Sequence, residues 1–307
     1  MSIITAQPRV ILERTQVNDV WEWLVSNISD RSVQTPGQCF VDDRKLWGVN
    51  IPQPLSSTDE FLINVAKLYL VSQLGDLSEI LGLSKGKGAF ELLLVTKNLD
   101  QDIRVVIASG RRFRDALSEH LGFWVTLGTI TKLHLYEIYA ISQPNFQPED
   151  KGPDGLFYGL DANGNPNIEI RSIKNSTRNP RYLIATGEFR KGGAAHKNKQ
   201  LEEYYLLVEE EYGFARLDRL LSQVSSHLKV APNVLTRSAL LKNASSYNAI
   251  VVANDMFHAP KLFDGFDRVF AAPENRIATY IGADRWAQFA ENTRSKVIEI
   301  LTVCGVW

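Results

Sequence analysis

Apolar residues recur at the spacing of an amphipathic helix in several parts of the chain. Phe113, Ala116 and Leu117 illustrate the pattern, because residues three or four positions apart lie on one face of a helix. Acidic residues at Asp59 and Glu60 precede another such run and favour a helix N-terminus there. The pattern predicts helices over residues 17–25, 59–71, 111–131, 200–212, 214–228 and 284–301.

Shorter apolar runs predict β-strands between these helices. The clearest run is YNAIVVA at residues 247–253, whose nearly continuous apolar character is typical of a strand buried on both faces. Proline and glycine mark residues 31–58 and 254–276 as mostly loop. The chain therefore predicts an α/β (α+β) fold with a mixed central β-sheet flanked by helices. The other predicted strands cover residues 90–95, 103–108, 133–141, 155–161 and 167–174.

The strands at 155–161 and 167–174 are expected to form a hairpin. Asn163-Gly164 lies between them and favours a two-residue type I′ turn, because both central positions of that turn need a positive φ. A two-residue loop pairs residues whose numbers sum to 327, whereas a three-residue loop pairs residues whose numbers sum to 326. The turn chemistry favours the first register, and a β-bulge would give the second.

The register decides which side chains lie beside Asp154, because successive residues of a strand point to opposite faces. In the first register Asp154 shares its face with Glu169 and Arg171. In the second it shares its face with Ser172 and Lys174, and Glu169 points away. Acidic and basic side chains together on a hairpin suit metal-assisted phosphodiester cleavage. Carboxylates hold Mg²⁺, which polarises the phosphate, and a cation supports the negative charge that develops on it.

Pro153-Asp154, followed by Glu169 and Arg171, resembles the active-site pattern of the PD-(D/E)XK nuclease superfamily. That pattern places an aspartate on one strand of a hairpin and Glu-x-Lys on the other, so Arg171 stands where the pattern has lysine. The resemblance implies a restriction-endonuclease-like core in which Asp154 and Glu169 ligate Mg²⁺. It also makes Glu119, on the preceding predicted helix, a candidate acidic residue of the site.

A second set of residues resembles the type II restriction endonucleases that cut CCGG-core sites. In that group serine often replaces the strand glutamate, and a glutamate about a helical step later takes over as metal ligand. Ser172, Lys174 and Glu188 follow this order, and Arg178 and Arg181 correspond to the arginines that read guanines in the group. The group differs in having a longer gap between its aspartate and its lysine strand.

Basic side chains cluster between residues 171 and 199, where Glu188 is the only acidic residue. The whole chain has a net charge of −1, so nucleic-acid binding depends on such local clusters. This cluster places a positive field beside the candidate metal site. The candidate nucleic-acid-binding residues are Arg178, Arg181, Arg190, Lys191, Lys197 and Lys199.

The composition is that of a globular protein, with 307 residues, 44% hydrophobic and 22% charged. Two cysteines exclude a disulfide framework and a cysteine-rich zinc site, and they fit a reducing cytoplasm. No apolar run reaches membrane-spanning length and no signal-peptide pattern opens the chain, so a cytoplasmic protein is expected. The nuclease-like core is expected over 111–307 after a mostly helical or mixed region at 1–110, unless 1–307 forms one continuous domain.

These observations predict a Mg²⁺-dependent endonuclease that hydrolyses double-stranded DNA, as a type II restriction or phage-defence enzyme. Asp154 would ligate the metal with Glu169 or Glu188, while Lys174 or Arg171 would position the attacking water. A homodimer is expected, because duplex sites are two-fold symmetric. The alternative is a non-catalytic nucleic-acid-binding protein that keeps the nuclease-like core. A structural protein whose basic patch docks an acidic partner is a third alternative.

Overall fold

The structure of the chain, a computed structural model, describes its main secondary-structure elements. The described residues are 10–13, 23, 26–27, 29–30, 45–53, 55–74, 91–94, 101–133, 137–141, 154–160, 166–178, 180, 244–254 and 276–307. The helices predicted at 200–212 and 214–228 lie outside these residues. Of the candidate site residues, Glu188, Arg181, Arg190, Lys191, Lys197 and Lys199 lie outside them as well.

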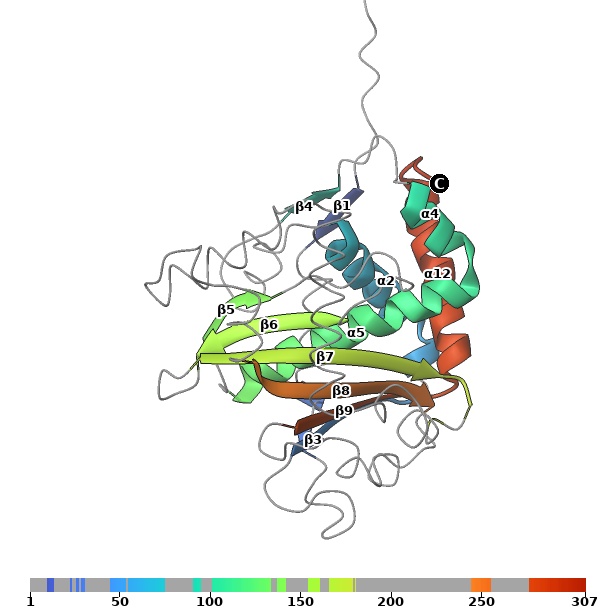
Figure 1. The fold of residues 1–307 in the computed structure, drawn as a ribbon. Coiled ribbons are helices and arrows are strands. Elements are labelled where there is room, and N and C mark those ends of the chain that lie inside the picture. Colours follow the sequence, from blue (N-terminus) through green and yellow to red (C-terminus); the bar gives the residue numbers. More distant parts are fainter. Residues whose placement is uncertain are drawn as a thin grey trace, which may run out of the picture.

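A seven-stranded sheet forms the centre of the described structure (Figure 1). From one edge to the other its strands are β2 (Ser29–Asp30), β3 (Lys45–Ile51), β9 (Arg276–Ala283), β8 (Ala244–Asn254), β7 (Pro166–Ser176), β6 (Gly155–Leu160) and β5 (Glu137–Ile141). The four central strands β3, β9, β8 and β7 run parallel. The outer strands β2, β6 and β5 each pair antiparallel with the neighbour on their inner side. The strand β7 therefore joins the parallel part of the sheet to the antiparallel part.

The long helices pack together on one face of this sheet (Figure 1). They are α2 (Asp59–Leu74), α4 (Gln101–Ala108), α5 (Gly110–Leu133) and α12 (Trp286–Val303). The helix α5 packs on β7, β8 and β9, and α12 packs on β8 and β9, while α2 contacts both of these helices. The predicted α/β class, with a sheet flanked by helices, is confirmed.

Smaller elements complete the described structure. A short 3₁₀ helix, η2 (Leu55–Ser57), precedes α2. The strands β1 (Val10–Glu13) and β4 (Glu91–Leu94) pair antiparallel in a separate two-stranded sheet. Among the helices described, none is both long and apolar enough to cross a membrane.

The core lies between the sheet and the helices that cover it. Alternate residues of each strand point to this side, and Ile173, Ile250 and Ile281 are 5%, 0% and 0% exposed there. The helix α5 approaches β7 closely at Gly122, where an added Cβ would lie 2.6 Å from Cδ1 of Ile173. Glycine at this position thus permits the close contact between helix and strand.

A polar cluster lies within the helical layer itself. Ser72 of α2 donates its hydroxyl to the carbonyl oxygen of Leu68 at 2.8 Å, and its oxygen lies 2.8 Å from Nδ1 of His120 on α5. The Trp124 indole N–H donates to the same oxygen at 3.2 Å. Complete burial lowers the pKa of His120 to about 3, so this imidazole is neutral at physiological pH.

Two of the predicted elements are wrong. Residues 103–108, predicted as a strand, belong to the helix α4, in which Ile103, Val106 and Ile107 are buried at helical spacing. Residues 31–58, predicted to be mostly loop, contain β3 with Val49 and Ile51 fully buried. In both cases tertiary packing outweighs local propensity, because β-branched residues also fill helix faces and a proline can directly follow a strand.

Candidate functional site

The structure gives the hairpin between β6 and β7 the second of the two registers. Gly155 pairs with Arg171 and Leu160 pairs with Pro166, so the numbers of paired residues sum to 326. The register that the Asn-Gly turn favours is therefore wrong. The reason is that the pairing is set over the full length of both strands, against which one local turn preference is weak. Continued by one residue, this register places Asp154 opposite Ser172.

Asp154 lies beside Lys174 in this register. The Asp154 Oδ2 atom is 3.8 Å from Nζ of Lys174, and the same oxygen accepts a hydrogen bond from the backbone N–H of Ile173. The side chains of Asp154 and Lys174 are 12% and 29% exposed, so both are partly open to solvent. A carboxylate held by a backbone donor, with an ammonium group beside it, can bind a cation or a phosphate from that solvent.

Ser172, between these two residues on the same face, is fully buried. Its hydroxyl oxygen has no hydrogen-bond partner within the described part of the chain. A buried polar atom that lacks a partner indicates a position that a water or a ligand can fill. Oxygen atoms of Asp154 and Ser172 are the donors that Mg²⁺ prefers, so these residues fit that ion. Among the described residues, no three His, Cys, Asp or Glu side chains gather at one place.

Glu169 and Arg171 lie on the opposite face of β7, beneath α5. Each is 1% exposed, and the Arg171 guanidinium carbon lies 5.7 Å from the ring centre of Phe123 on α5. The Asn248 amide N–H donates to Glu169 at 3.2 Å, and the Thr279 hydroxyl donates to the Asn248 oxygen at 3.0 Å. The structure therefore does not bring Glu169 and Arg171 together with Asp154, because residues 169 and 171 alternate in direction with 172 and 174.

The buried environment changes the pKa of Glu169. Burial raises the pKa of Glu169, and the charge of Arg171 and the hydrogen bond from Asn248 act in the opposite direction. Glu119, the acidic candidate on α5, is also buried, at 5% exposure; burial raises the pKa of the Tyr69 hydroxyl on α2, and the charge of Glu119 adds to this rise. This interaction places Glu119 toward the helical layer.

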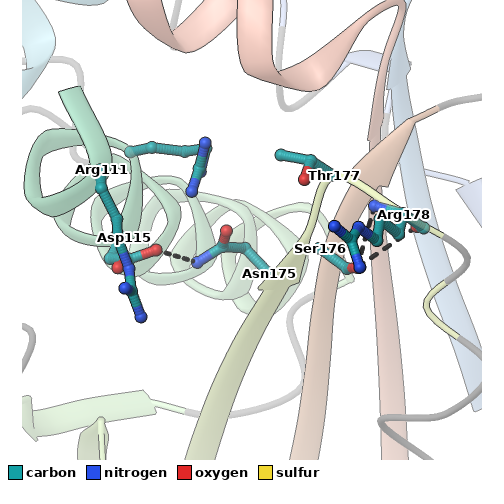
Figure 2. A pocket seen from close by; sticks show the side chains of 7 residues that line it. Arg111, Asp115, Asn175, Ser176, Thr177 and Arg178 are labelled. Carbon is teal, nitrogen blue, oxygen red and sulfur yellow. Dashed lines mark hydrogen bonds between the residues drawn. The ribbon is translucent and has the colours of Figure 1, made fainter.

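A cavity of about 440 Å³ lies beyond the end of β7, between that strand and the start of α5. The helix contributes Arg111, Arg114 and Asp115 to its walls, and residues 175–178 line the other side. The Asn175 amide donates to the Asp115 carboxylate at 2.8 Å across the space. Figure 2 shows Arg111 and Asp115 on the helix side of this space and Arg178 on its far side, beyond the end of the strand. Of the predicted nucleic-acid-binding residues, Arg178 alone is described, and it is exposed.

Sequence reasoning missed the arginines at the start of α5. The signal was present as GRRFRD at residues 110–115, where three basic residues fall within the first two turns of a predicted helix. The positive end of the helix dipole lies there, so acidic residues are the usual choice. Arginines at that end add charged donors to a helix terminus whose backbone N–H groups already favour anions.

Comparisons with known proteins give no relative on which to base a function. No protein-family model, no curated protein and no solved structure matches the chain.

Proposed function

We propose that this protein is a Mg²⁺-dependent endonuclease that cuts double-stranded DNA, with a restriction-endonuclease-like core. The observation that carries the proposal is the position of Asp154 next to Lys174, with Nζ and Oδ2 3.8 Å apart on one face of the β6–β7 hairpin. The order of the sheet supports it further. A helix, α5, is followed by the antiparallel strands β5, β6 and β7, and β8 then joins parallel to β7.

The arrangement favours the second of the two sequence patterns. Ser172 and Lys174 share the face of Asp154, whereas Glu169 is buried on the other face and cannot reach the same ion. Asp154 is therefore proposed as the first metal ligand and Glu188 as the second carboxylate. Arg171, beneath α5, is proposed to support the fold.

Each residue would contribute a separate part of the chemistry. Asp154 holds the metal, which when bound supplies Lewis-acid polarisation of the phosphate. Lys174 orients the attacking water and stabilises the negative charge that develops on the phosphate. Arg178, at the end of the same strand, contacts the DNA, together with the basic residues that follow it. The proposed partners are duplex DNA and a second copy of the chain, which would match the two-fold symmetry of a duplex site.

The test is cleavage of plasmid and phage DNA with Mg²⁺, with EDTA as the metal-free control. Asp154→Ala and Lys174→Met are expected to slow cleavage roughly 100- to 1,000-fold, since each removes a group that acts in the transition state. Glu188→Gln should slow cleavage to a similar extent. Glu169→Gln should cleave at the parent rate, provided that circular dichroism shows that it folds. Binding to labelled duplex, measured without metal, should persist in Asp154→Ala.

Each other outcome has a defined meaning. DNA binding without cleavage under any metal would refute the enzyme and leave a non-catalytic nucleic-acid-binding protein. Loss of cleavage in Glu169→Gln but not in Glu188→Gln would refute the assignment of the second carboxylate. A chain that neither cuts nor binds DNA would remove both proposals.

A further inference from the structure

The cavity at the end of β7 carries an excess of positive charge. Among the described residues, Arg111, Arg114 and Arg178 line it together with one acid, Asp115. The Asp115 carboxylate accepts its hydrogen bond from the neutral amide of Asn175, at 2.8 Å. The described part of the walls thus carries three cations and one anion, a net charge of +2. Such a charge excess in a cavity attracts an anion, because the low-dielectric walls concentrate the field there.

The guanidinium groups of this cavity retain donors for a ligand. Within the described part of the chain, no ion pair engages Arg111, Arg114 or Arg178. The Nε atom of Arg114 is buried and has no hydrogen-bond partner among the described residues. A buried donor without a partner is costly, and an oxyanion in the cavity would satisfy it. Ser176 and Thr177 add hydroxyl groups to the opposite wall.

We propose that this cavity binds a phosphate group of the DNA backbone, with Arg111 and Arg114 as its main ligands. This inference rests on the proposed function and extends it to residues of α5. The cavity begins at Asn175 and Ser176, one to two residues beyond Lys174 on the same strand. Two residues of a strand span about 7 Å. The bound phosphate would therefore be a near neighbour of the phosphate that is cut, because both would belong to one bound duplex.

The position of the cavity suits this role, because it lies where a substrate of the proposed site would continue. Parallel strands end at this edge of the sheet, and ligands of α/β proteins bind outside the carboxyl ends of their strands. The arginine fork is also matched to phosphate, since its donors lie in one plane and can engage two oxygens together. A clamp of this kind would fix the register of the DNA against Asp154 and Lys174.

The experiment measures binding of the full-length chain to a fluorescent DNA duplex, without metal, between about 50 and 200 mM salt. The double variant Arg111→Gln/Arg114→Gln should bind roughly ten-fold more weakly. The slope of log affinity against log salt should become shallower by about 0.9 for each phosphate that the variant no longer neutralises. The matched control is Arg112→Gln, which removes one charge from the same helical turn at a residue that does not line the cavity. Its affinity and slope should stay near those of the parent.

Two further arms make the result specific. Arg111→Lys/Arg114→Lys, which keeps both charges, should recover most of the salt slope but only part of the affinity, because the bidentate geometry is absent from lysine. Calorimetry with inorganic phosphate tests whether a free anion occupies the cavity. Binding of phosphate that depends on Arg111 and Arg114, with duplex affinity unchanged in the variants, would overturn the assignment to DNA.

The outcomes separate this inference from the nuclease proposal. Unchanged affinity and slope in Arg111→Gln/Arg114→Gln would overturn the phosphate cavity, even if the parent cuts DNA. An equal loss of affinity and slope in Arg112→Gln would overturn it too. The loss would then depend on the net charge of the helix and not on whether the arginine lines the cavity. If the parent never cuts DNA yet the double variant alone loses affinity and slope, the nuclease proposal fails and the phosphate cavity stands.

Discussion

The two faces of β7 carry charged side chains in different surroundings. Beneath α5, Glu169 and Arg171 are each 1% exposed and belong to a network that reaches Asn248 and Thr279 on the next two strands. On the other face, the side chain of Lys174 is 29% exposed beside Asp154. The two sets lie only a few residues apart in sequence. A charge pattern along a strand therefore does not identify a site until the register and the covering layer are known.

The difference between the faces is energetic as well as geometric. On the buried face each charge has lost its water, so it is tolerated only because its partners remain in place. On the other face both charges keep part of their solvation, so their mutual attraction contributes little to folding. The buried set should therefore control stability, and the exposed set should control activity.

The largest effect on stability is expected from Arg171→Met. This change leaves the Glu169 carboxylate buried without its neighbouring cation, which should lower the free energy of unfolding by about 3–5 kcal/mol. Urea denaturation followed by circular dichroism measures it. The double variant Glu169→Leu/Arg171→Met should regain most of that loss, because no uncompensated charge remains. A loss below about 1 kcal/mol in Arg171→Met would contradict the contrast between the faces.

A smaller effect is expected from pH, through the helix that covers the buried face. The pKa of His120 is about 3 in the folded chain, against 6.5 as its ordinary value. Between these values the unfolded chain binds the proton and the folded chain does not, so stability decreases as the pH falls below about 6.5. The decrease should approach about 1.4 kcal/mol per pH unit.

The variant His120→Gln isolates this contribution, since glutamine keeps a polar group near Ser72 and does not titrate. Glu169 acts in the opposite direction, because a raised pKa makes the folded chain bind the proton first and adds stability as the pH falls. The comparison of parent and variant by urea denaturation at pH 7, 6 and 5 cancels that shared term. Parallel pH profiles for the two proteins would rule out a neutral, buried His120.

The smallest effect on stability is expected from Lys174→Met, on the partly exposed face. A pair separated by 3.8 Å with a 29% exposed lysine should contribute no more than about 1 kcal/mol. The same substitution type on the same strand as Arg171→Met makes the two variants directly comparable. Denaturation and DNA cleavage should then give opposite rankings for the pair. A loss of about 3 kcal/mol or more in Lys174→Met would show that this face is structural as well.

The sequence predicted the elements whose pattern is long or continuous. The helices α2, α5 and α12 follow from apolar positions repeated over several turns, and β8 follows from its unbroken apolar run. These patterns are informative because many residues agree with one period. A short element has too few residues to establish a period, so its packing partner determines whether it forms a helix or a strand.

The strand β3 and the helix α4 illustrate that limit. Ile103, Val106 and Ile107 are β-branched and suggest a strand, yet their spacing of three and four places them on one helix face. The strand β3 gains its stability from β9, a partner that its own sequence cannot reveal. No local sequence pattern could have shown that β3 and β9 lie side by side.

The candidate site was predictable in its residues but not in its arrangement. Asp154 and Lys174 were both identified from sequence, as was Ser172 between them. The choice between registers could not be predicted. Turn chemistry at Asn163-Gly164 is a local preference, whereas the pairing of β6 with β7 depends on both strands over their whole length. The arginines of α5 escaped notice because their meaning depends on the end of β7, which approaches them only in the folded chain.

The pairing of β3 with β9 also sets the order in which the protein can assemble on the ribosome. Lys45 lies against Ile277, more than 200 residues later in the chain. At usual rates of translation, β3 is made roughly 10 to 50 s before its partner leaves the ribosome. In the later part of that interval, once residue 176 has been made, the hairpin that carries Asp154 and Lys174 can form, while the central sheet beside it is incomplete. A proposed DNA-cutting protein would thus complete its central sheet only after β9 has been made.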